Sequence, residues 1–188
     1  MAAKDKPMID LLLKRNSHAR LVDPGPSSAQ WQTIVQAALR APDHGHLRPW
    51  RFLIIEGDRR AALGEVFLQA AALNGVQDEA LLAKAEKAPL RAPAILAGLL
   101  RHQSHAKISR EEQGRAVAAA LYGAQLAAES MGFGVIWRTG GYATDPQVVT
   151  ALGGAPGDEV VGFLYIGTRE GPSKVLPETP VETFSQHF

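Results

Sequence analysis

A long alanine-rich segment, residues 109–134 (SREEQGRAVAAALYGAQLAAESMGFG), constrains the fold more than any other feature of the sequence. Ser109 followed three residues later by Glu112 is the pattern of a capping box, and the glycines of the final GFG favour an end of the helix there. The helix retains Gly123 in its interior, although a glycine costs about 1 kcal/mol relative to alanine. Because small side chains let backbones approach closely, we expect one long helix in a crowded centre or at a subunit interface.

Helical and strand-like patterns alternate irregularly along the rest of the chain. Helical patterns occupy residues 8–16, 24–42, 59–75, 78–89 and 145–153. Short apolar runs predict strands at residues 50–57, 92–100, 134–141 and 158–167. This order predicts an α+β fold with four or five strands between helices, in a single domain of residues 1–188. The tail after residue 168 has no clear period, so we expect a loose terminus or an arm that crosses to a neighbouring molecule.

Composition excludes some functions. The 188 residues contain no cysteine, which excludes disulfides, thiolate nucleophiles and cysteine-ligated zinc. A formal net charge of +1 gives no reason to expect nucleic acid or an anionic membrane as a partner. The longest apolar run, APAILAGLL, is far shorter than the ~20 residues of a membrane span. A cytoplasmic protein is therefore expected.

Residues 40–50 (RAPDHGHLRPW) form a rigid, charged corner in front of an apolar strand. Asp43, His44 and His46 offer three possible metal ligands, but the other histidines show no recognisable ligand spacing. A polar turn in which Asp43 accepts hydrogen bonds from backbone N–H groups is the better interpretation. That interpretation accounts for Asp43 better than for His44, and no metal site is predicted.

Two further stretches have the chemistry to contact a ligand. Arg15 and Ser17 suit phosphate oxygens, although a solvated basic helix end is the ordinary alternative. Trp137 and Arg138 precede the glycine pair at 140–141, which would let the backbone approach a flat ligand; a core tryptophan and a turn is the alternative. The sequence contains neither a G-x-S-x-G motif nor a dinucleotide-binding glycine fingerprint.

Taken together and in this order, the motifs resemble those of the nitroreductase-like FMN proteins. The matching stretches are RNS at 15–17, RAPDH at 40–44, PW at 49–50, GFG at 132–134, IWRTG at 136–140 and VGFLYIGT at 161–168. The resemblance covers the chain from about residue 8 to residue 168. It implies a mostly antiparallel sheet flanked by helices and an intertwined homodimer. Two FMN sites would lie at the subunit interface, with the long helix packed across the dimer.

The same resemblance implies three groups of FMN-binding residues. The first matches the segment that holds the phosphate and ribityl end, the second is the arginine and histidine of RAPDH, and the third lies near the cofactor, with contacts from both chains. In that order the groups are Arg15, Asn16 and Ser17; Arg40 and His44; and Trp137, Arg138 and Thr139. A guanidinium near the N1 edge of the flavin favours its reduced form, and Arg40 is the first candidate for this position, with Arg138 second.

Several positions depart from the family pattern. Asn16 stands where the pattern has a second arginine, and Arg48 stands where it has glutamine, so Arg48 could restore the lost charge. A basic phosphate ligand late in the chain could be Arg169 or Lys174.

The resemblance implies an FMN-dependent NAD(P)H oxidoreductase that passes two electrons to small nitroaromatic or quinone-like acceptors by a ping-pong mechanism. No residue is predicted as a catalytic acid or base, because hydride transfer needs proximity first and water can supply protons. The residues favour neither NADH nor NADPH. Two alternatives stay open: a flavin-binding protein with little or no turnover, and a metal-dependent hydrolase built on Asp43, His44 and His46.

Overall fold

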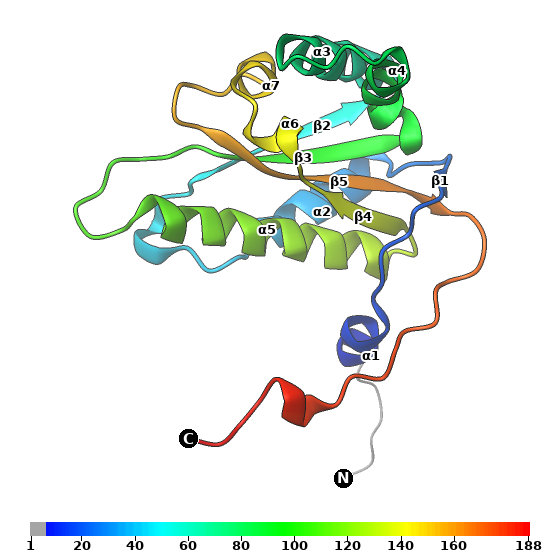
Figure 1. Cartoon of the computed structure of the whole chain (residues 1–188). Helices are drawn as coiled ribbons and strands as arrows, with labels where there is room; N and C mark the ends of the chain where they lie inside the picture. The colour runs from blue at the N-terminus through cyan, green and yellow to red at the C-terminus, as the bar shows by residue number, and fades with distance from the viewer. Residues whose placement is uncertain (1–6) are drawn as a thin grey trace.

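A five-stranded antiparallel sheet forms the middle layer of the computed structural model, which describes residues 7–188 (Figure 1). The strands are β1 (Leu21–Val22), β2 (Trp50–Glu56), β3 (Ala94–Leu100), β4 (Gly134–Arg138) and β5 (Glu159–Arg169). Their order is β1-β5-β3-β2, and β4 pairs with β5 on the same side as β1. Every residue of β3 is buried, as is typical of a central strand covered on both faces. The predicted α+β fold and its antiparallel sheet are confirmed.

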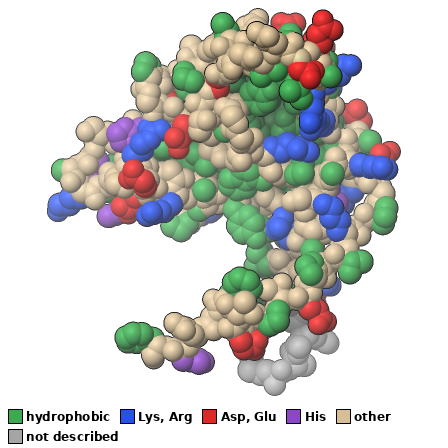
Figure 2. Space-filling model, viewed as in Figure 1, with side chains coloured by type: hydrophobic (Ala, Val, Ile, Leu, Met, Phe, Trp, Pro, Cys, Tyr) green, Lys and Arg blue, Asp and Glu red, His purple; other side chains and the backbone are tan. Residues whose placement is uncertain are grey.

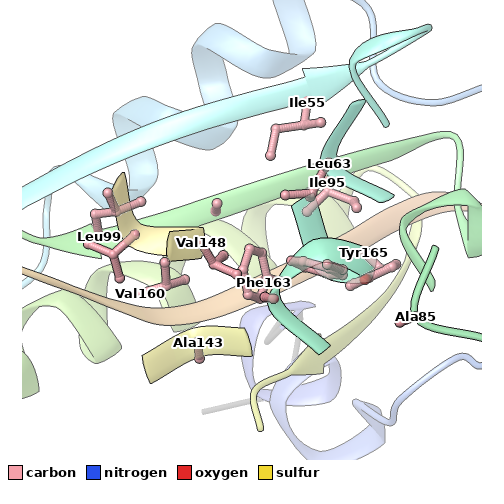
Figure 3. Packing of buried hydrophobic residues seen from close by; sticks show 14 of the residues in the cluster. Ile55, Leu63, Ala85, Ile95, Leu99, Ala143, Val148, Val160, Phe163 and Tyr165 are labelled. Carbon is pink, nitrogen blue, oxygen red and sulfur yellow. The ribbon is translucent and has the colours of Figure 1, made fainter. Parts of the chain in front are cut away.

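Helices cover both faces of the sheet (Figure 1). One face packs against α2 (Ser28–Ala38) and α5 (Arg110–Ser130), which meet the sheet in one apolar cluster. The other face packs against α3 (Arg59–Leu73), α4 (Glu79–Lys87), α6 (Gly141–Thr144) and α7 (Pro146–Ala151). Because side chains alternate along a strand, β5 sends Phe163 and Tyr165 into this second cluster and Leu164 and Ile166 into the first. Figure 3 shows Phe163 and Tyr165 beside Ile95 of β3.

The close packing of α5 explains the small residues in its sequence. Ser109 caps the helix by accepting a hydrogen bond from the Glu112 backbone N–H. Leu121 fills the space above Gly98 of β3, so that a Cβ added at Gly98 would lie 2.7 Å from a methyl carbon of Leu121. A Cβ on Gly123 would lie 3.3 Å from the Ala37 carbonyl oxygen. Close packing of α5 on the sheet and on α2 therefore explains why two glycines are used.

Some predicted boundaries differ from the structure. The first helix, α1 (Pro7–Lys14), ends before Arg15, so residues 15–20 form an extended segment instead of a helix end. The corner at residues 40–50 contains a short 3₁₀ turn, η1 (His44–His46). The predicted turn after β4 continues into α6, and β5 extends to Arg169, beyond its predicted end.

The two ends of the described chain leave the sheet together (Figure 1). After β5, residues 170–188 run past α1 and contain one short 3₁₀ turn, η3 (Val181–Thr183). Val175 and Phe184 in this segment are 95% and 79% exposed. Over residues 7–188, no helix combines the length and the apolarity needed to cross a membrane.

Candidate functional site

A cavity of about 560 Å³ opens between α3, α4 and the strands β4 and β5. Trp137, Arg138 and Thr139, the third predicted group, all line it. On the face seen in Figure 2, hydrophobic side chains lie recessed beneath α3 and α4, with Lys and Arg side chains beside them. We call this cavity the aromatic pocket, because its lining includes the rings of Phe67, Tyr142, Phe163 and Tyr165.

Aromatic packing gives the pocket a flat wall. The rings of Phe67 and Tyr142 stack with centroids 4.3 Å apart and planes 6° from parallel, and Phe163 meets Phe67 edge-on at 5.6 Å. Trp137 lies over Gly162 of the neighbouring strand, where any Cβ would overlap the indole nitrogen. Gly162 is therefore required for the position of the indole, which packs on the other face of the sheet, against the cluster of α2 and α5. The stacked rings of Phe67 and Tyr142 form the flat wall of the pocket, which suits a planar ligand.

Arg138 carries most of the buried positive charge in the pocket. Its guanidinium carbon lies 5.5 Å from the centroid of the Tyr165 ring, and its Nε is buried without a hydrogen-bond partner. Burial raises the pKa of Tyr165 to about 12, against the opposing effect of Arg138 and Arg91. The phenol is therefore a neutral hydrogen-bond donor at ordinary pH.

The first predicted group lies near the start of β4. The backbone N–H of His18 donates to the Val135 carbonyl at 3.1 Å, so the extended segment after α1 runs beside β4. Arg15 and Ser17 are half-buried, whereas Asn16 and His18 are buried. The Asn16 Oδ1 atom and both ring nitrogens of His18 are buried without a partner. Such unpartnered polar atoms are costly unless a ligand satisfies them.

Three basic side chains surround this segment, and we call Arg15, Arg169 and Lys174 the basic cluster. A Cβ on Gly134 would lie 2.9 Å from Cγ of Arg169 and 3.1 Å from Cβ of His18, so both side chains cover Gly134. Burial lowers the pKa of His18, and the positive charges of Arg169, Lys174 and Arg15 lower it further. Both candidates for a late basic ligand thus lie within electrostatic reach of His18.

One acidic side chain accompanies the basic cluster. Glu129, near the end of α5, is only 4% exposed and accepts a hydrogen bond from Gln125 at 2.9 Å. Burial raises the pKa of Glu129, an effect partly offset by Gln125, Arg15 and Arg169. One carboxyl beside three basic side chains leaves these four groups with a net positive charge suited to an anion.

The basic cluster and the aromatic pocket lie at opposite ends of β4. The cluster lies at Gly134, and the pocket begins at Trp137 and Arg138. At ~3.3 Å per residue, the strand separates these two ends by roughly 13 Å. The arrangement suits a ligand with a flat ring at one end and an anionic group at the other.

Arg40 and His44, the second predicted group, lie elsewhere in the chain. Both follow α2, in the layer opposite the aromatic pocket. The His44 Nδ1 atom lies 2.6 Å from Oε1 of Glu112, in the first turn of α5. At ~1.5 Å per residue, Glu112 and Glu129 lie roughly 25 Å apart along α5. One copy of the chain therefore does not bring His44 to the basic cluster.

The corner itself is the predicted polar turn. Asp43 Oδ2 accepts a hydrogen bond from the Arg48 backbone N–H at 2.7 Å. His46 and Arg48 adopt positive φ angles of 53° and 50°, which are uncommon for residues other than glycine. Arg48 thus lies in the same corner as His44. Within residues 7–188, no three side chains of types that bind metal ions gather into a possible site.

The sequence analysis did not predict several residues of the site. They are His18, Lys84, Arg91, Glu129, Tyr142 and Tyr165. Tyr165 could have been found, because alternation along an apolar strand places it on the same face as Phe163. Lys84 and Arg91 carry no such signal, since their proximity to β4 depends on how α4 packs on the sheet.

Comparison with known proteins agrees with this geometry. Residues 12–168 match the sequence model described as "Nitroreductase family", and the chain belongs to that family. It is 41% identical over 162 residues to "Putative NAD(P)H nitroreductase YdjA" of Escherichia coli (strain K12), covering 86% of this chain and 88% of that protein. The resemblance read from the motifs is thereby confirmed.

Solved structures share the fold. A nitroreductase-like family protein from Bacillus cereus superposes with a TM-score of 0.83 at 23% identity, covering 100% of this chain and 98% of the other. A nitroreductase from Bacteroides fragilis, solved with bound FMN, superposes with a TM-score of 0.75 at 19% identity, covering 98% and 100%.

Proposed function

We propose that this protein is an FMN-dependent NAD(P)H oxidoreductase whose cofactor spans the basic cluster and the aromatic pocket. The observation that carries the proposal is the placement of these two features at opposite ends of β4. FMN has a phosphate dianion at one end and a flat ring at the other, and the Bacteroides fragilis relative in fold holds this cofactor. The family membership of the chain supports the same assignment.

The residues present fit this cofactor. Arg15, Arg169 and Lys174 would hold the phosphate through charge-assisted hydrogen bonds, and Ser17 would add a hydroxyl donor. The buried, unpartnered atoms of Asn16 and His18 would gain partners from the phosphate and ribityl groups. Arg169 and Lys174 would compensate for the second arginine that the family pattern has at position 16.

At the other end of the site, Trp137 and Thr139 would orient the flat ring, and Arg138 would favour negative charge close to it. When bound, FMN supplies the chemistry, taking two electrons from NAD(P)H and passing them to an acceptor. The protein excludes water with its aromatic wall and holds the reactants close together. We propose nitroaromatic or quinone-like acceptors and a ping-pong order, because donor and acceptor would share one open pocket.

A homodimer would complete the site. Two copies of α5 packed antiparallel about a twofold axis would bring the Glu112 end of one helix beside the Glu129 end of the other. Arg40 and His44 of a second copy would then approach the basic cluster. The middle of the outward face of α5 suits such packing, because between residues 118 and 126 its exposed or half-buried residues are Ala118, Ala119, Tyr122, Gly123 and Leu126. The exposed Val175 and Phe184 would find cover on the same second copy. A cytoplasmic location fits the proposal because NAD(P)H is available there.

Anaerobic stopped-flow mixing of the FMN-loaded protein with NADH and with NADPH tests this function. We expect one or both donors to bleach the flavin absorbance, and a nitroaromatic or quinone acceptor to restore it. Parallel double-reciprocal lines would support the ping-pong order.

Two results would favour the alternatives. Bound flavin that neither donor bleaches would favour a flavin-binding protein with little turnover. Stoichiometric zinc or iron in a protein that binds no flavin would favour the hydrolase.

A further inference from the structure

The aromatic pocket gathers positive charge at one place beyond the predicted cofactor residues. Besides Arg138, its lining includes Lys84 of α4 and Arg91, which follows α4 in a short 3₁₀ turn. Arg91 and Arg138 both act electrostatically on the hydroxyl of Tyr165. Two guanidinium groups from different segments therefore converge on one buried phenol.

This positive charge has no counterion. The pocket lining contains no carboxylate. Among residues 7–188, no salt bridge involves Lys84, Arg91 or Arg138. The buried Nε of Arg138 also lacks an acceptor. Lys84 and Arg91 are exposed, whereas Arg138 is half-buried. A buried polar group without a partner is unfavourable, so an anion that reached Arg138 would be stabilised, with Arg91 adding a second positive charge.

Arg91, Arg138 and Tyr165 together form a set of hydrogen-bond donors. Arginine donates through a planar fork that matches the two oxygens of a carboxylate. Tyr165 is 2% exposed and keeps its proton at ordinary pH, so its hydroxyl can donate as well. Two guanidinium groups and one phenol are a donor set typical of a carboxylate site.

The walls of the pocket specify the rest of the ligand. The stacked rings of Phe67 and Tyr142, with Phe163 beside them, favour a planar aromatic body. The phosphate of FMN would occupy the basic cluster at the other end of β4. Negative charge on the reduced flavin would face Arg138, which leaves Arg91 as the positive charge without a cofactor partner.

We infer that Arg91, Arg138 and Tyr165 form an anion subsite that selects aromatic electron acceptors bearing a carboxylate. The inference rests on the proposed function, since it names the acceptor class of the same site. Arg91 can be tested independently of the cofactor, because it is not among the predicted FMN contacts. It follows α4, whereas the nearest predicted contacts lie in β4 and in the segment after α1.

A matched pair of acceptors tests the subsite in the FMN-loaded enzyme: 4-nitrobenzoate and its uncharged analogue 4-nitrobenzamide. We expect kcat/KM to be at least about tenfold higher for the carboxylate, as one charge-assisted contact supplies. Arg91→Gln should remove this preference mainly through KM. Arg59→Gln, at the far end of α3 and outside the pocket, is the matched control and should retain the preference.

A binding measurement gives a readout separate from turnover. Benzoate, which the enzyme cannot reduce, should perturb the visible absorbance of the oxidised, FMN-loaded protein. Its Kd should rise about tenfold in Arg91→Gln and several-fold in Tyr165→Phe. Added salt should weaken benzoate binding in the unsubstituted protein more than in Arg91→Gln.

Each other outcome decides against the inference. Equal kcat/KM for the two acceptors without benzoate binding, in a flavoprotein that NAD(P)H reduces, overturns the subsite and leaves the proposed function standing. Loss of FMN from Arg91→Gln assigns Arg91 to the cofactor and also overturns it. A protein that binds no FMN overturns the proposed function and this inference with it.

Discussion

Arg169 has two tasks in the structure, and a single substitution can separate them. Its Nε donates to the Phe133 carbonyl at 3.0 Å, which fixes the side chain above Gly134. Its positive charge faces the buried His18 and, in our proposal, the phosphate of FMN. The first task concerns local structure and the second concerns an anion.

Arg169→Gln should therefore weaken FMN binding by about 10- to 100-fold, the range expected for one hydrogen bond to a charged group. Fluorescence titration of the apoprotein with FMN measures this change. Riboflavin, which lacks the phosphate, is the control ligand, and its affinity should change little. An equal loss for both ligands would show that Arg169 acts only through the structure around Phe133.

His18 should make the stability of the apoprotein depend on pH. Its pKa in the folded protein lies below the ordinary value of 6.5, because the ring is buried and faces three positive charges. Below pH 6.5 the unfolded chain therefore binds more protons than the folded one, and stability is lost as the pH falls. At fixed protein concentration, the free energy of unfolding in urea should decrease from pH 7 to pH 5, and His18→Gln should decrease less.

His102→Gln is the matched control, because the side chain of His102 is exposed in the loop before α5. It should keep the pH dependence of the unsubstituted protein. Identical slopes for the His18 and His102 variants would contradict the assignment of this effect to His18.

At the scale of elements, the crossing of α3 and α4 depends on one glycine. A Cβ on Gly64 would overlap the backbone carbonyl of Glu86 in α4. Gly64→Ala should therefore destabilise the protein by about 1–3 kcal/mol, the usual effect of overpacking, although alanine is the better helix former.

Gly114→Ala in α5 provides the comparison, because the nearest atom to its Cβ would be a methyl carbon of Leu100 at 3.8 Å. There the helix propensity should dominate and stabilise the protein by up to ~1 kcal/mol. Thermal and urea denaturation measure both changes. Stabilisation by Gly64→Ala would show that α3 and α4 are packed less closely than described.

The elements differ in how far local sequence determines them. α5 and β3 could be predicted, since a capping signal, an alanine-rich run and a continuous apolar run are local properties. The helix α6 could not, because its four residues begin at the second glycine of a pair and carry no helical period. Local patterns also could not place Arg91 beside Tyr165, since α4 and β5 are far apart in the chain and meet only through packing.

The candidate site was predictable only through combined motifs. Arg15 or Trp137 alone had an ordinary structural explanation, and the order of several motifs identified the family. The sequence could not predict the separation between Arg40 and the aromatic pocket, because this separation depends on which face of the sheet α2 covers.

At the scale of the whole molecule, one copy of the chain does not bring all the predicted FMN-binding residues together. The basic cluster and the aromatic pocket flank β4, whereas His44 contacts the opposite end of α5. A twofold axis through α5 would combine the two ends from different copies. The central claim is therefore that Arg15 of one copy and Arg40 of another contact the same FMN.

Mixed dimers of Arg15→Gln and Arg40→Gln test this claim most directly. If the two residues act across the interface, one site of each mixed dimer lacks both arginines and the other site retains both. The account predicts that purified mixed dimers bind one FMN per dimer with the affinity of the unsubstituted protein, while either variant alone binds FMN weakly. Mixed dimers in which both sites bind FMN as weakly as the parent variants would contradict it.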